Sequence, residues 1–242
     1  MHWTPIMIVP VSKNYLKGHI PPDYCRLEGL EALDLYENNL VGRILSCFNA
    51  FQNLKHVHLS KNKLQGEFNI FSNNSYLELL DLRDNNFSGS IPKWLDSTSM
   101  ITTLLLKGNH LQGTITPQLC HARFEKFGGD ALINLEHSME SSNALDIYAW
   151  VRAEFTTKYN TFSYDGGILS YMSGVDLSCN QLICEIPKEL SNLTEINGLN
   201  LSHNHLTGVI PSEFSNLKNI ESLYKHRTSA GKKCLLMKQK TY

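Results

Sequence analysis

The stretch that decides the fold lies near the end of the chain, where residues 172–195 read MSGVDLSCNQLICEIPKELSNLTE and residues 196–219 read INGLNLSHNHLTGVIPSEFSNLKN. Six side chains return after 24 residues (199 − 175), in the pairs Val175/Leu199, Leu177/Leu201, Asn180/Asn204, Leu182/Leu206, Ile186/Ile210 and Pro187/Pro211. The first two apolar positions are two residues apart, so on an extended strand both point to the same face. One such unit cannot bury that face alone, which predicts a stack of units.

The same frame extends backward through the chain. Five further units open at Ile6, Leu30, Leu54, Leu77 and Ile101, and each has Asn at position eight and Gly at position twelve, counting from zero. An inward Asn satisfies backbone groups where the chain leaves the strand, and Gly suits a bend with positive φ. We therefore predict an α/β leucine-rich-repeat right-handed solenoid with one short strand per unit in a parallel concave sheet and a 3-10 or irregular convex side.

The repeat pattern is interrupted once and fades at the end. We expect five units over residues 6–120, an island insertion over 121–171, two units and a partial third over 172–224, and a disordered basic tail over 225–242. The alternating, Thr- and aromatic-rich segment 148–164 of the island favours a hairpin or extended strand.

Several segments carry a family resemblance. Residues 154–159 (EFTTKY) and 171–180 (YMSGVDLSCN) resemble the island-to-repeat junction of plant leucine-rich-repeat receptor-like proteins, and residues 199–204 (LNLSHN) and 214–223 (FSNLKNIESL) are similar too. The resemblance implies a recognition protein on the extracellular side of the plasma membrane, which signals in defence or development through a co-receptor or adaptor kinase. A full member would also have a signal peptide, more repeats and a membrane span, and none of these is seen in this sequence.

Composition excludes several classes of function. The 242 residues carry a net charge of −1, which does not fit a nucleic-acid or polybasic membrane footprint. No apolar run approaches the ~20 residues that span a bilayer. No phosphate-binding, nucleophile-elbow or zinc-protease motif is present, so we predict a protein that is not an enzyme and needs no cofactor or metal.

The cysteines and histidines suggest a few special sites. Cys25 and Cys47 fall on adjacent units, whose spacing of about 5 Å is within the span of a disulfide; the alternative is two small buried residues. His56 and His58 share one face of one strand, and Asp34 and Asp81 of adjacent units should stack beside His58. A metal-dependent hydrolase built on these histidines is one alternative, and a polar binding or solvated face is the other.

Outward-facing strand positions define the predicted ligand surface. They form a broad, mostly acidic concave face for a peptide or protein ligand, made of Asp34, Tyr36, His56, His58, Asp81, Arg83, Lys107 and Asp176. The island adds aromatic contacts, namely Trp150, Phe155, Tyr159 and Tyr164, which either anchor an interface or form a private core. Four N-x-S/T sequons predict glycosylation at Asn73, Asn86, Asn192 and Asn200.

The function that these features predict is non-enzymatic recognition of a peptide or protein by part of a receptor-like extracellular domain. One alternative is a secreted leucine-rich-repeat inhibitor of cell-wall-degrading enzymes, since the same repeat type supports it. Another is a truncated, non-functional remnant.

Overall fold

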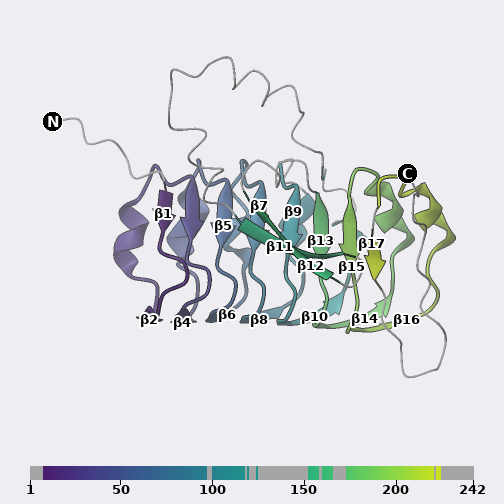
Figure 1. Ribbon diagram of the computed structural model, residues 1–242, viewed down its shortest axis with the longest axis horizontal. Helices are drawn as coiled ribbons and strands as arrows, with labels where there is room; N and C mark the ends of the chain where they lie inside the picture. Colours follow the sequence, from purple (N-terminus) through teal and green to yellow (C-terminus); the bar gives the residue numbers. More distant parts are fainter. Residues whose placement is uncertain are drawn as a thin grey trace, which may run out of the picture.

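The computed structural model describes residues 8–96, 100–117, 119, 124, 152–157, 160–165, 173–220 and 222–224. Over these residues the chain is a leucine-rich-repeat solenoid whose coils stack in sequence order along the long axis of the molecule (Figure 1). Here a coil means one repeat of about 24 residues. The predicted fold class is confirmed.

The concave side is a parallel sheet of short strands, one from each coil. Its order is β1-β3-β5-β7-β9-β13-β15-β17. The strands are β1 (Ile8–Pro10), β3 (Ala32–Asp34), β5 (His56–His58), β7 (Leu79–Asp81), β9 (Thr103–Leu105), β13 (Gly174–Asp176), β15 (Gly198–Asn200) and β17 (Ser222–Tyr224). The middle residue of each strand from β3 to β15 points inward and is buried.

A second parallel sheet runs along one flank, and it corrects the prediction of one strand per unit. Its order is β16-β14-β10-β8-β6-β4-β2. The strands are β2 (Lys17–Gly18), β4 (Asn39–Gly42), β6 (Lys63–Gly66), β8 (Asn86–Gly89), β10 (His110–Thr114), β14 (Gln181–Glu185) and β16 (His205–Thr207). The extended backbone before the Gly bend lies at strand spacing from its neighbour, so its N–H and C=O groups pair across coils.

The convex side consists of short 3-10 helices. They are η1 (Pro22–Arg26), η2 (Ser46–Ala50), η3 (Asn69–Phe71), η4 (Lys93–Asp96), η7 (Lys188–Asn192) and η8 (Ser212–Asn216). Their apolar residues, such as Phe48, Phe71 and Phe214, are fully buried or nearly so and close the core from this side. Phe71 packs edge-on against Trp94 of the next coil, with 6.5 Å between ring centroids.

A ladder of buried asparagines ties each coil to the one before it. Asn62 Nδ2 donates to the carbonyl oxygens of Leu35 (2.8 Å) and Leu59 (3.1 Å), and Asn62 Oδ1 accepts from the Leu40 N–H (3.0 Å). One short side chain thus satisfies backbone groups of two coils at the point where both leave the strand.

The island does not interrupt the coil stack. β9 pairs directly with β13 in parallel, with Thr103 opposite Gly174. Within the island, β11 (Arg152–Thr157) and β12 (Asn160–Asp165) pair antiparallel, with Phe155 opposite Phe162. The expected hairpin is confirmed, and Figure 1 shows it in front of β9 and β13.

Candidate functional site

Two columns of outward-facing residues run along the concave sheet. The residues of the first column are Ala32, His56, Leu79, Thr103, Gly174 and Gly198, and those of the second are Asp34, His58, Asp81, Leu105, Asp176 and Asn200. Strand pairing places Asp34 and Asp81 on either side of His58, as the sequence predicted. The columns bring residues that are far apart in the sequence into one surface.

Asp81 is the centre of a charged cluster. Arg83 donates to its carboxylate twice, from Nε to Oδ1 (2.8 Å) and from Nη2 to Oδ2 (2.7 Å). Ser60 Oγ also donates to Oδ2 (2.8 Å), and His58 Nδ1 lies 3.8 Å from the same oxygen. Burial alone raises the pKa of Asp81, but the charge and hydrogen bonds of Arg83 and His58 outweigh it and hold that pKa well below its usual range.

Asp176, one column position beyond Leu105, has a different environment. Its carboxylate accepts hydrogen bonds from Ser178 Oγ (2.6 Å) and the Ser178 N–H (2.9 Å), and Asn200 Nδ2 lies 3.4 Å away. Burial raises the pKa of this carboxyl, because the hydrogen bonds from Ser178 and the charges of Lys107 and Arg83 offset only part of the desolvation. Two carboxylates of one column therefore differ in their tendency to ionise.

The first coils carry a half-buried aromatic group between two ammonium groups. Lys61 Nζ donates to the Tyr36 hydroxyl (2.8 Å) and lies 5.1 Å from the ring centroid, and Lys13 Nζ lies 5.9 Å from the same centroid. Asp34 Oδ1 accepts from the Tyr36 N–H, and Glu31 pairs with Lys55 at 2.9 Å. We call Glu31, Asp34, Tyr36 and Lys61 the open strip, since each is half-buried or exposed.

The predicted ligand residues of the middle coils are covered. His56, His58, Asp81, Arg83 and Asp176 are all buried, although alternation along their strands points them out of the sheet. Leu79 and Leu105 show that this part of the concave face is covered. Their side chains face outward in the same columns, yet are only 3% and 0% exposed. Sheet neighbours alone leave the top of such a side chain in water, so a further layer lies over β7 and β9.

The other predicted sites are placed as follows. Lys107 is half-buried at the end of the strand region after β9. The side chains of Trp150, Phe155, Tyr159 and Tyr164 lie outside the described residues. Cys25 and Cys47 form a disulfide with a Cα–Cα distance of 5.6 Å. Ser60, Lys13 and Ser178 were missed, although a signal existed: Ser60 and Ser178 share the repeat position of Tyr36 and Arg83.

The four sequons differ in exposure. Three of the asparagines are exposed: Asn73 on the convex side, Asn86 on β8, and Asn192 at the end of η7. Asn200 is buried on the concave side, where its Oδ1 accepts from Ser202 Oγ at 2.8 Å. A glycan on Asn200 would require this side chain to leave its partners, so we propose glycosylation at the three exposed positions alone.

Neither a metal-binding cluster nor a membrane-spanning helix occurs among the described residues. They contain no group of three or more His, Cys, Asp or Glu side chains with metal-binding geometry. Within the same residues, no helix is both long and apolar enough to cross a bilayer.

A 24-residue coil with a parallel concave sheet and a buried Asn ladder defines a leucine-rich-repeat protein. The family model described as Leucine Rich Repeat matches residues 76–97 and 196–217. Receptor-like protein 32 of Arabidopsis thaliana is 30% identical over 236 residues, covering 76% of this chain and 26% of the relative. Receptor-like protein 14 of the same species is 33% identical over 236 residues, covering 79% and 24%. The chain therefore belongs to the plant leucine-rich-repeat receptor-like proteins.

A solved structure supports the same relationship. The Arabidopsis receptor kinase HAESA, in complex with the peptide hormone IDA and the co-receptor SERK1, is 28% identical with a TM-score of 0.59, covering 91% of this chain and 34% of that one. The chain spans about a quarter of the length of the curated relatives it matches. Extracellular domains of this repeat class are generally recognition modules rather than enzymes.

Proposed function

We propose that this chain is a non-enzymatic recognition module of a receptor-like protein, which binds a peptide or protein ligand on the extracellular side of the plasma membrane. The observation that carries the proposal is the open strip, where the half-buried Tyr36 ring, the Asp34 carboxylate and Lys61 lie on adjacent coils, with Lys13 beside the same ring. An aromatic ring with charged groups beside it is typical of interface anchors. HAESA, whose solved complex contains a peptide hormone and a co-receptor, supports a peptide ligand and a partner kinase here.

The island hairpin completes the proposed surface. We infer that β11 and β12 form the layer over β7, β9 and β13, because Leu79 and Leu105 are covered and the hairpin lies in front of this part of the sheet in Figure 1. A ligand then contacts the open strip and the outer side of the hairpin. His58, Asp81 and Arg83 act as a buried support for the covered strands and do not touch the ligand.

The proposal is tested by selecting binders from a displayed library of short peptides. Peptides enriched on the full chain are measured against the variant Asp34→Lys/Tyr36→Ala and against the matched control Lys63→Ala/Gln65→Ala, which changes two exposed residues of the flank strand β6. We expect at least a ~10-fold loss of affinity, about 1.4 kcal/mol, for the first variant and no loss for the control. Equal binding by all three proteins would contradict the proposed site.

The same peptide selection also tests whether the protein acts in defence or in development. The structure favours neither defence nor development, so the sequence of the enriched peptides, compared with peptides that plants secrete in each process, is the discriminating observation. Enrichment of no peptide above background on a folded chain would argue for the truncated-remnant reading.

A further inference from the structure

The last two complete coils expose two aliphatic side chains on the flank, which we call the apolar patch. Val209, between the Gly bend and the half-buried Ile210, is 81% exposed, and Ile183 on β14 is 46% exposed. The residues at the position of Val209 in the other coils are His19, Arg43, Glu67, Ser90, Thr114 and Glu185. An exposed aliphatic side chain at a repeat position that is otherwise polar, beside two prolines of the same surface, marks a contact surface better than exposure alone.

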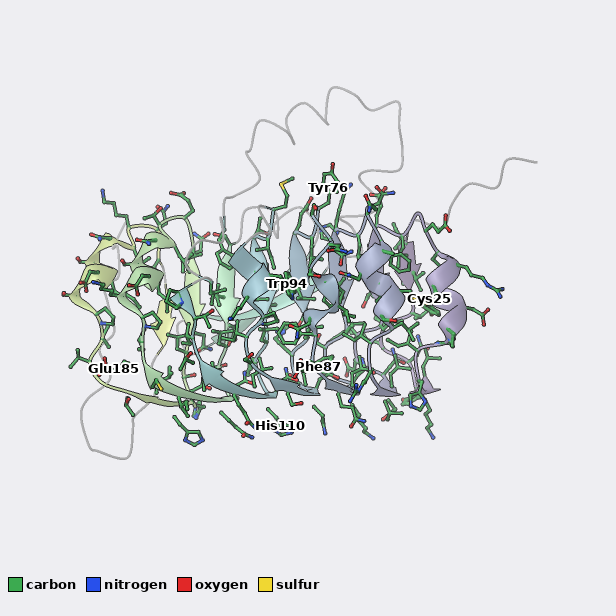
Figure 2. All side chains as sticks on the ribbon, turned by 180° about the vertical axis from the view of Figure 1, so that it is seen from behind. Cys25, Tyr76, Phe87, Trp94, His110 and Glu185 are labelled. Carbon is green, nitrogen blue, oxygen red and sulfur yellow. A yellow bond between two sulfur atoms is a disulfide. The ribbon has the colours of Figure 1, made fainter. Side chains whose placement is uncertain are left out.

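The patch borders a shallow hollow between two coils. The hollow has a volume of about 390 Å³ and includes Pro187, Val209 and Pro211 as apolar lining, with Glu185, Glu213 and Lys188 as charged lining. The Glu185 side chain lies close to Gly208, with its Cγ 2.9 Å from the position that a Cβ on Gly208 would take. Figure 2 shows Glu185 at this end of the flank, with His110 further along the same edge.

Charge separates the coils from the tail of the chain. Residues 225–242 contain six Lys and Arg and no acidic residue, which leaves 16 basic and 23 acidic residues, a net charge of −7, for residues 1–224. The coils that form the hollow, residues 173–220, carry five acidic and two basic side chains, a net charge of −3. Attraction between oppositely charged parts of one chain favours their contact.

The tail also has an apolar centre that matches the patch. Leu235, Leu236 and Met237 follow Lys232 and Lys233 and precede Lys238 and Lys240. An apolar triplet between lysines fits an apolar hollow that has carboxylates at its edge, because both the burial and the charge contacts are then satisfied.

The tail is long enough to reach the hollow. Tyr224 pairs with Asn200 on the neighbouring coil, and nine residues of that coil lead from Asn200 to Val209. Leu235 is the eleventh residue after Tyr224. A tail that ran parallel to the neighbouring coil would need nine residues to come level with Val209, so it has two more than it needs, or about 7 Å of extended chain.

We propose that the basic tail, residues 225–242, docks on its own coil stack, with Leu235, Leu236 and Met237 over Val209 and Pro211 and with the flanking lysines beside Glu185 and Glu213. This contact is independent of the proposed ligand site, which lies on the concave side of the first coils. Docking covers the apolar patch and lowers the net charge of this end of the molecule.

Cys234, next to the apolar triplet, is a natural probe of this contact. The rate at which iodoacetamide alkylates Cys234 in the full chain is followed by mass spectrometry of its tryptic peptide and compared with a synthetic peptide of residues 225–242. An effective concentration of millimolar order against a millimolar dissociation constant predicts a ~2-fold slower reaction in the chain. We expect Val209→Lys to restore the rate of the free peptide, because it removes the apolar contact and adds repulsion.

The matched control is Ser90→Lys, the same substitution at the same repeat position of an earlier coil. Its Cys234 should react as slowly as in the unchanged chain, and ~1 M NaCl should accelerate both. A Cys234 rate equal to that of the free peptide, or one that Val209→Lys and Ser90→Lys alter equally, would overturn the proposal. Protection that disappears on dilution would also overturn it, since the tail of a second molecule would then be the occupant.

Discussion

The Asn ladder gives the sharpest quantitative expectation, and Asn62 is its best-defined member. Substitution by Ala removes three hydrogen bonds donated to carbonyl oxygens and one accepted from the Leu40 N–H. The carbonyl oxygens of Leu35 and Leu59 keep a second donor, Asn38 and Asn85. The buried Leu40 N–H loses the acceptor described for it, Asn62 Oδ1. Leaving a buried donor without an acceptor costs about 1–3 kcal/mol of stability. With about 0.5 kcal/mol for each weakened carbonyl, Asn62→Ala should lower the free energy of unfolding by ~2–4 kcal/mol.

Urea denaturation followed by circular dichroism measures this change, with Lys63→Ala, an exposed neighbour on β6, as the control. Asn62→Asp should be at least as damaging as Asn62→Ala, because a carboxylate then faces three carbonyl oxygens without a proton to donate. The reasoning is refuted if Asn62→Ala costs less than ~1 kcal/mol, or if Asp at this position is harmless.

Four further predictions concern stability. Reducing the bond between Cys25 and Cys47, or replacing both by Ser, should cost about 3 kcal/mol, since the bridge closes a loop of 22 residues; an unchanged urea midpoint after reduction would contradict this. Asp81 has a depressed pKa, so its stabilisation is complete above the ordinary Asp range and is lost as the pH falls from about 5 towards 2; Asp81→Asn should cost about 3 kcal/mol at pH 7 and flatten the acid limb of stability against pH. Asp176 has a raised pKa, so ionising it opposes folding above that pKa, and Asp176→Asn should raise stability at pH 7 and lose this gain in acid; a loss at pH 7 would show that the charge is needed. Cys184 has a φ of 69° where other coils have Gly, so Cys184→Gly should raise the thermal midpoint by relieving up to ~1 kcal/mol of strain, and a lower midpoint would refute the strain.

The sequence predicted the coil because its signals are local and periodic. Leu59 and Asn62 recur with their equivalents every 24 residues, and both are buried as that pattern requires. The strand at Lys63–Gly66 was missed, because its pairing depends on backbone groups of adjacent coils and leaves no apolar alternation in the side chains.

The candidate site was predicted in part. Alternation placed His58 and Asp81 correctly on the outer face of their strands, and the 24-residue frame placed them side by side. It could not show that this face is covered, because the layer that we infer over it, the island hairpin, lies outside the repeat, where no period links a residue to the surface it meets. Tyr36, which follows β3, is half-buried rather than buried.

The direct pairing of β9 with β13 has a consequence for how such proteins diversify. Thr103 and Gly174 are partners 71 residues apart, whereas ordinary partners such as Ala32 and His56 are 24 apart. Closing the longer loop costs only about 1 kcal/mol more, because loop entropy grows with the logarithm of length. Asn180 bonds across the junction to Leu106 O at 2.9 Å and accepts from the Leu111 N–H at 3.0 Å, as Asn62 does within the regular array. The coil stack therefore tolerates an inserted segment between two paired coils. Such a segment can be exchanged, and the recognition surface changed with it, without any change in the pairing of the coils.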